Sequence, residues 1–144
     1  MMPECMFSSC LYFSTNRLTR AMNKLAEEEF SKAGVAPTYA FLLILVHQQP
    51  GITPSELAEN LHMAPSTITR FVDKLIVKNL VTKQSEGKNS YIYLTDKGKD
   101  IQEQLNGHWK NLNEAYSQIL GEAWGYELTS NISKAARSIE TKIK

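Results

Sequence analysis

Cysteine is scarce in this sequence, and its scarcity excludes two kinds of cross-link. The 144 residues contain only Cys5 and Cys10, five positions apart near the N-terminus. Two cysteines do not make the disulfide framework of a small secreted domain, so we expect reduced thiols. Neither a CxxC pair nor a cluster of histidines accompanies them, so the sequence predicts no metal site. A chain of this length can bury a core without such cross-links.

Long hydrophobic runs are absent as well. The longest run extends from Tyr39 to Val46, far short of the roughly 20 residues that a membrane-spanning helix needs. The N-terminus also lacks the basic segment and apolar stretch that mark a secretory signal. The sequence therefore predicts a cytoplasmic protein that has no membrane partner.

The signatures of catalysis are missing too. The sequence has no glycine-rich phosphate loop, no HExxH pair and no Ser-His-Asp spacing, and His47, His62 and His108 are scattered along it. We therefore expect no enzyme and no cofactor.

Net charge is close to zero, but the charges are segregated. The whole chain carries a formal charge of +1, whereas residues 62–99 contain seven basic and three acidic side chains, a net +4. The remainder must therefore carry about −3. A basic segment in an otherwise acidic chain is compatible with a nucleic-acid partner.

Apolar spacing predicts a mainly α-helical fold with one small β-hairpin. We expect a helix of roughly 30 residues from Phe7 to Gly34, a second that is apolar all round from Pro37 to about His47, and two short helices. The short helices begin at Pro54, after a Thr53–Glu56 capping box, and at Pro65, after the turn His62-Met63-Ala64. Two short helices joined in this way are a helix-turn-helix pattern.

The second half of the sequence predicts the wing and two further helices. Asn79 is a plausible left-handed cap, after which residues 80–83 should pair with residues 91–94 around a polar span that contains Glu86 and Gly87. Thr95 should then cap one long helix that reaches Ile119 or Leu120. A last helix should follow the segment from Gly121 to Gly125.

The helix that begins at Pro65 has the pattern of a DNA-recognition helix. Five apolar residues are expected to face inward: Ile68, Phe71, Val72, Leu75 and Ile76. The outward face then carries Ser66, Thr67, Thr69, Arg70, Asp73 and Lys74. Arg70 is the best candidate for a base contact, at a guanine edge, because a guanidinium offers a fork of donors. The alternative is an ordinary solvated helix face.

The hairpin favours the DNA-binding interpretation, because a basic wing follows the helix directly. The complete predicted DNA-contacting set is Thr53, Ser55, Pro65, Ser66, Thr67, Thr69, Arg70, Lys74, Lys83, Lys88, Asn89 and Ser90.

Residues 52–100 resemble the core of MarR-family transcriptional regulators. The matching motifs are Ser66-Thr67-Ile68-Thr69-Arg70, then Lys74-Leu75 with Leu80-Val81, and the closing Leu94-Thr95-Asp96-Lys97-Gly98. The long flanking helices match as well. The wing departs from the pattern, since Glu86-Gly87-Lys88 stands in a shorter loop where many members carry Asp-Arg-Arg. We therefore expect this wing to clamp the DNA backbone rather than read its sequence.

The resemblance implies a homodimer on a pseudo-palindromic double-stranded DNA operator. In the single domain 1–144, residues 36–98 would form the winged helix-turn-helix part, and residues 4–34 and 99–144 the helical dimerisation part. The family pattern further implies a repressor released by a small aromatic effector. Candidates for its pocket are Cys10, Tyr12, Phe13, Tyr39, His47, His108 and Trp109, of which Cys10, Tyr12, Tyr39 and Trp109 are the predicted set. The alternatives are a redox switch at Cys10 or Cys5 and a winged-helix protein-interaction module.

Overall fold

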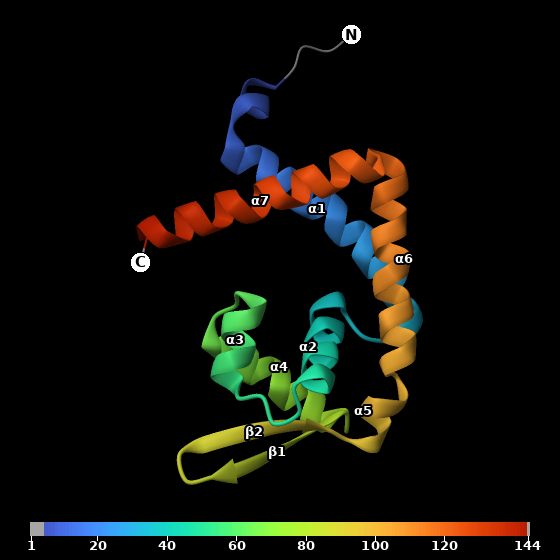
Figure 1. The fold of residues 1–144 in the computed structure, drawn as a ribbon, viewed down its shortest axis with the longest axis vertical. Helices are drawn as coiled ribbons and strands as arrows, with labels where there is room; N and C mark the ends of the chain where they lie inside the picture. The colour runs from blue at the N-terminus through green and yellow to red at the C-terminus, as the bar shows by residue number, and fades with distance from the viewer. Residues whose placement is uncertain (1–4, 144) are drawn as a thin grey trace. The chain divides into compact units, whose positions relative to one another are not determined.

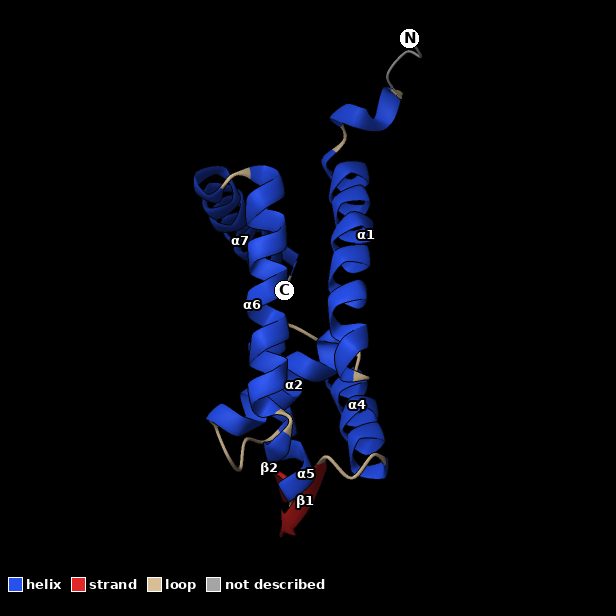
Figure 2. Ribbon diagram, turned by 90° about the vertical axis from the view of Figure 1, so that its right-hand side faces the viewer, coloured by secondary structure: helices blue, strands red, loops and turns tan. Residues whose placement is uncertain are grey.

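The computed structural model describes residues 5–143, which form two compact units divided between His108 and Trp109. The first unit contains a 3₁₀ turn η1 (Met6–Ser9), α1 (Leu11–Phe30), a 3₁₀ turn η2 (Ser31–Ala33), α2 (Pro37–Gln48), α3 (Pro54–Leu61), α4 (Pro65–Val77), β1 (Val81–Glu86), β2 (Asn89–Leu94) and α5 (Asp96–Asp100). Helix α6 (Gln102–Leu120) runs from the first unit into the second, and α7 (Glu122–Ile143) follows. The fold is thus mainly helical with one hairpin, as predicted (Figure 2).

The core of the first unit is built around α2. No residue from Pro37 to Val46 is exposed, as expected for a helix that is apolar on all sides. Helices α1 and α3 and strand β2 pack against α2, while α3 and α4 pack on each other above the hairpin (Figure 1). The largest fully buried side chains are Phe30, Leu42, Leu43, Val46, Leu57, Ile68, Leu75, Val81, Ile92 and Leu105.

Local capping signals fix the helix-turn-helix. The Thr53–Glu56 capping box is confirmed, with the Glu56 N–H donating to Thr53 Oγ1 at 3.2 Å and the Thr53 N–H to Glu56 Oε1 at 3.4 Å. His62 ends α3 in the left-handed conformation, with φ 54°. Asn79 takes φ 61° after α4, and the Leu80 N–H donates to Leu75 O at 2.9 Å. This is a Schellman ending, so the predicted cap at Asn79 is confirmed.

The hairpin is longer than predicted. Val81 pairs with Leu94, and pairing continues to Glu86 opposite Asn89, so the polar span is itself strand. The turn is Gly87-Lys88, in which glycine supplies the positive φ of 60° that a two-residue turn requires at its first position. Ile52 adds a short antiparallel bridge to Ile92.

The predicted 30-residue N-terminal helix is wrong at its start. The backbone at Cys10 is extended, with φ −88° and ψ 121°, so η1 and α1 are separate elements. Ser14, in the first turn of α1, donates its hydroxyl to Ser8 O at 3.2 Å across this break. Such a serine–backbone bond competes with helix continuation. The predicted end is confirmed, since Gly34 has φ 73°.

The single helix predicted after Thr95 is also wrong, because it is divided at Ile101 into α5 and α6. Gln102 Nε2 donates to Gly98 O at 3.1 Å and to Leu43 O at 3.3 Å. In a continuous helix, Gly98 O would instead accept the N–H of residue 102. The buried side chain of Gln102 therefore binds the break to α2.

The second unit consists of the later part of α6 and α7. Helix α7 begins at Glu122, so the predicted break from Gly121 to Gly125 shrinks to Gly121, where φ is 93°. Several large apolar side chains of this unit are exposed: Trp109, Ile119, Trp124, Tyr126, Ile132, Ile139 and Ile143.

No single helix in residues 5–143 has both the length and the apolar character needed to cross a membrane. The segments Leu11–Ala33 and Pro37–Gln48 meet these two criteria only when they are taken together, and the pair is bent by 64°.

Candidate nucleic-acid interface

Helix α4 presents a polar face opposite its buried stripe. The stripe is centred on Ile68, Val72 and Leu75, which are buried. At about 100° per residue, Ser66 and Arg70 lie on the opposite side of the helix, and both are exposed. The other predicted contact residues Pro65, Thr69 and Lys74 are exposed as well. The sequence therefore placed most of this face correctly.

Two residues at the edges of the stripe differ from the prediction. Thr67, expected to face outward, is half-buried, and Ile76, expected to face inward, is 37% exposed. Both lie roughly 80–100° from Ile68 around the helix, where the apolar and polar faces meet. Binary patterning does not decide residues at such an edge.

The N-terminus of α4 has no side-chain cap. Ala64 is its N-cap residue and Pro65 its first residue. The Thr69 hydroxyl donates back to Pro65 O at 3.1 Å. Pro65 has no N–H, and Thr67 and Ile68 donate theirs to Ala64 O at 3.0 and 3.1 Å. The first turn therefore offers the N–H of Ser66 and the positive end of the helix dipole, an arrangement suited to a phosphate or a base edge.

Two predicted residues at the start of α3, its N-cap Thr53 and Ser55, differ in how accessible their hydroxyls are. Thr53 is half-buried, and its hydroxyl donates to Glu56 Oε1 at 2.9 Å while it accepts the Glu56 N–H. Ser55 is exposed on the first turn of the helix. Of the two, Ser55 has the more accessible hydroxyl.

The wing carries three exposed predicted residues, Lys83, Lys88 and Asn89, and the half-buried Ser90. Lys83 pairs with Ile92, which places it on the face of the hairpin that turns toward the helices. Lys88 occupies the two-residue turn, and Glu86 lies opposite Asn89 beside it. The tip therefore carries one cation next to a carboxylate.

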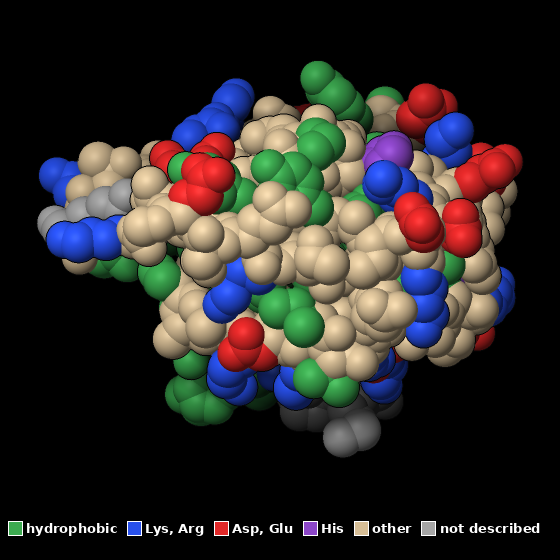
Figure 3. Space-filling model, turned by 90° about the horizontal axis from the view of Figure 1, so that it is seen from below, with side chains coloured by type: hydrophobic (Ala, Val, Ile, Leu, Met, Phe, Trp, Pro, Cys, Tyr) green, Lys and Arg blue, Asp and Glu red, His purple; other side chains and the backbone are tan. Residues whose placement is uncertain are grey.

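Basic side chains do not form one continuous field. Figure 3 shows the lower surface, where Lys and Arg side chains stand as separate groups among acidic, apolar and polar ones. Lys78 lies with its ammonium 5.9 Å from the centre of the Tyr39 ring, an arrangement that favours a cation–π contact. Charge alone therefore defines no binding surface here.

The predicted effector residues lie in different places. Tyr39 packs edge-on against Phe71 with ring centres 4.6 Å apart, as part of the contact between α2 and α4. Cys10 and Tyr12 are exposed at the far end of α1, a 20-residue helix and so about 30 Å long. Trp109 is an exposed residue of the second unit.

A cavity of about 330 Å³ lies elsewhere in the first unit, between the end of α2, the outer face of the hairpin and α5. Of the aromatic candidates it includes His47. Its lining is Val46, His47, Pro50, Thr82, Gln84, Tyr93, Leu94 and Lys99.

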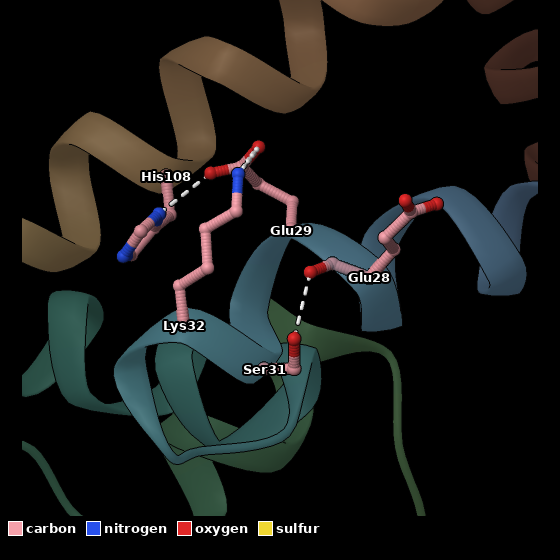
Figure 4. Close-up of polar contacts among 5 residues, drawn as sticks. All are labelled: Glu28, Glu29, Ser31, Lys32 and His108. Carbon is pink, nitrogen blue, oxygen red and sulfur yellow. Dashed lines mark hydrogen bonds and ion pairs between the residues drawn. The ribbon is translucent and has the colours of Figure 1, made fainter.

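His108 joins α6 to the end of α1. Its Nδ1 lies 2.6 Å from Glu29 Oε2, and both side chains are largely buried. The second oxygen of Glu29 lies 3.4 Å from Lys32 Nζ (Figure 4). The His108 ring also meets Phe30 at a centre distance of 5.9 Å. This arrangement fixes the imidazole and gives His108 a packing role in the first unit.

Comparisons with known proteins agree with this geometry. The MarR family model matches residues 36–89, from the start of α2 to the hairpin tip. The HTH-type transcriptional repressor MdtR of Bacillus subtilis (strain 168) is 28% identical over 120 residues, which are 81% of this chain and 77% of MdtR.

The fold is also similar to solved structures of one repressor in two states. CouR bound to a 23-mer DNA duplex has a TM-score of 0.82 at 17% identity over 93% of this chain and 99% of that one. CouR from Rhodococcus jostii RHA1 bound to p-coumaroyl-CoA has a TM-score of 0.77 at 17% identity over 92% and 96%. Residues 36–89 thus match the MarR family model, and over most of its length the chain is similar to a transcriptional repressor and to solved structures of winged-helix regulators.

Proposed function

We propose that this protein is a repressor that binds a pseudo-palindromic operator in double-stranded DNA as a homodimer. The observation that carries the proposal is the face of α4 on which Ser66, Thr69, Arg70 and Lys74 are exposed opposite the buried stripe. The repressor relative and the DNA-bound fold neighbour support the same function. A protein that regulates transcription in this way acts in the cytoplasm and is not an enzyme.

In this proposal the two kinds of contact have different roles. Arg70, on the side of α4 opposite the buried stripe, reads a guanine edge through its two-pronged donor geometry. Ser66, through its hydroxyl and its N–H in the first turn of α4, binds phosphate or a base edge. Lys83 and Lys88 of the wing clamp the backbone. Thr67 and Thr53 contribute less, because the former is half-buried and the latter caps α3.

The terminal helices supply the dimer contacts. Exposed apolar side chains occur in η1 and at the start of α1, in Met6, Phe7 and Leu11, and along α7, in Trp124, Tyr126, Ile132, Ile139 and Ile143. Apolar surface of this extent is unusual on a monomer and marks an interaction surface. We therefore assign residues 4–34 and 99–144 to dimerisation and residues 36–98 to DNA binding.

Release from DNA is assigned to a small-molecule effector, in line with the ligand-bound fold neighbour. The redox alternative has a direct test, because Cys5 and Cys10 are both exposed free thiols. Replacing both by serine should leave release by the effector unchanged. A peroxide response that the wild-type protein shows and this variant loses would support the redox switch, whereas a peroxide response unchanged in the variant would refute it.

Selection of bound sequences from a random duplex pool tests the function. At one fixed salt concentration the protein should enrich an inverted repeat whose half-sites lie about one helical turn apart. Arg70→Ala should lose the enrichment at one position of each half-site, whereas the exposed control Lys24→Ala should retain the full motif. Absence of any enriched inverted repeat would refute the proposal.

A further inference from the structure

Residues at the start of α5 bind three successive carbonyl groups just after α4, those of its C-cap residue Lys78 and of Asn79 and Leu80. Lys97 Nζ donates to Lys78 O at 3.2 Å, and the Thr95 hydroxyl donates to Asn79 O at 2.7 Å. The Thr95 N–H donates to Leu80 O at 3.1 Å. The C-cap carbonyl lacks a partner inside the helix, and the two carbonyls after it lie in the turn that leads to β1. One short segment supplies the donors to all three. The C-terminal end of α4 is therefore attached to α5.

Gly98 completes this attachment through close approach. A Cβ at position 98 would lie 2.2 Å from Leu80 O, a backbone atom that cannot turn aside as a side chain could. The Gly98 N–H also donates to Thr95 Oγ1 at 3.0 Å. The Thr95 hydroxyl thus caps α5 as an acceptor and binds Asn79 as a donor. We call Thr95, Lys97 and Gly98 the α5 clamp.

The clamp is in turn attached to the rest of the first unit. Gln102, which is 5% exposed, donates to Gly98 O and to Leu43 O. It therefore joins α5 and the first turn of α6 to α2. Helix α6 then leads toward the residues assigned above to dimerisation.

The clamp lies at the C-terminal end of α4, so a small tilt of the helix at this end would move the N-terminal turn that carries Ser66. Ser66 lies 12 residues from Lys78, or about 18 Å along α4. A tilt of roughly 5° at the C-terminal end would move the N-terminal turn by about 1.5 Å, enough to break a hydrogen bond of ordinary length. The stripe of Ile68, Val72 and Leu75 holds one side of α4, and the clamp holds its end.

We propose that Thr95, Lys97 and Gly98 are positioning residues for DNA recognition, which do not touch the operator but fix the angle of α4 to the dimerisation helices. This inference rests on the proposed DNA-binding function. Because two copies of α4 must reach two half-sites together, the clamp sets which half-site spacing the dimer prefers.

The first test measures the recognition helices without DNA. In a Cys5→Ser, Cys10→Ser background, a spin label on Asp73→Cys reports the distance between the two α4 helices of a dimer by pulsed electron spin resonance. Thr95→Val removes the hydroxyl at nearly constant shape and should broaden or shift the distance distribution. Thr95→Ser keeps the hydroxyl and should restore the original distribution. Circular dichroism and sedimentation check that each variant is folded and dimeric.

The second test measures binding to operators whose half-site spacing is the selected one or differs by one base pair. Thr95→Val and Gly98→Ala should lose about fivefold or more in affinity at the selected spacing and discriminate less between spacings, with an unchanged slope of log K against log salt. Lys97→Met should also lower the affinity and the discrimination between spacings. Because it alters only an exposed side chain, this variant still tests the inference if the other two fail to fold.

Three results would overturn the inference. One is an unchanged distance distribution and spacing preference in folded Thr95→Val or, if that variant does not fold, in Lys97→Met. The second is a loss of equal size at every spacing. The third is a salt slope for Lys97→Met that falls by about 1 per protomer, which would make Lys97 a phosphate contact. Failure of the proposed function is distinguishable, because the wild-type protein would then enrich no inverted repeat.

Discussion

Salt should weaken operator binding with a slope that the structure bounds. Each lysine or arginine that neutralises a phosphate releases a counterion, so log K falls with log salt by about 0.9 per contact. Residues 62–99 contain seven basic side chains. Three of these seven contact other parts of the protein or line a cavity, and are therefore not counted as phosphate contacts. Lys97 binds Lys78 O, Lys78 lies over the Tyr39 ring, and Lys99 lines the cavity at the outer face of the wing.

Four cations per protomer therefore remain for DNA: Arg70, Lys74, Lys83 and Lys88. Because Arg70 is assigned to a base edge, three lysines per protomer, or six in the dimer, approach phosphates and give a slope of about −5. The full set of seven would give about −13 for the dimer. The difference is large enough to decide between the two counts.

Fluorescence anisotropy of a labelled operator between about 50 and 300 mM salt measures the slope. The matched variants are Lys83→Met, which should reduce it by about 2 for the dimer, and Lys97→Met, which should leave it unchanged. A wild-type slope near −13 would refute the assignment of Lys78, Lys97 and Lys99 to intramolecular roles. A slope near −2, which Lys74 alone would give, would contradict the placement of the wing on the backbone.

Four further substitutions, two of them with a matched control, test separate parts of the structure. Arg70→Ala should cost about 1–3 kcal/mol per half-site and relax specificity at one base pair, which operators altered at single positions will reveal; an equal loss on every sequence would contradict a base contact. Lys74→Ala should weaken binding to all sequences alike and lower the salt slope by about 1 per protomer. Thr53→Ala removes the capping box and should lower the free energy of unfolding by about 1 kcal/mol, as measured by urea denaturation; the exposed neighbour Ser55→Ala should change it by less than about 0.5 kcal/mol. His108→Leu removes the short contact with Glu29 and should cost about 1–3 kcal/mol in the same assay, whereas exposed His47→Leu should be nearly neutral.

Features governed by neighbouring residues could be predicted from the sequence. The capping box needs only Thr53 and Glu56, three positions apart, and the Schellman ending needs a residue such as Asn79 that tolerates a positive φ. The face of α4 follows from 3.6-residue periodicity. The helix-turn-helix, and the residues it exposes, were therefore accessible without a structure.

The breaks at Cys10 and Ile101 could not be predicted in this way. Both segments have helical spacing of apolar residues on either side, so periodicity continues across each break. The division of α5 from α6 is accompanied by a bond from Gln102 to Leu43, 59 residues earlier in the chain. A contact over that separation leaves no signal in a local window.

The role of the closing Leu-Thr-x-x-Gly motif was likewise hidden in the sequence. The motif supports the family resemblance, but the reason for its threonine and glycine appears only when α5 meets the end of α4. Gly98 does not need a positive φ; it needs the absence of a Cβ beside Leu80 O. The sequence could not identify effector residues for a similar reason. The spacing of aromatic residues does not distinguish the packing of Tyr39 on Phe71 from a ligand site.

In the proposed function, recognition is divided unequally between the wing and α4. The hairpin extends to a two-residue turn, and its tip offers Lys88 beside Glu86 and Asn89. A single ammonium next to a carboxylate gives little discrimination between bases, so the wing can hold the backbone but reads little sequence. Discrimination then depends on Arg70 and the first turn of α4, and the angle of that helix becomes the critical variable. A regulator with a modest wing therefore gains most from a firm attachment at the other end of α4, where Thr95, Lys97 and Gly98 lie.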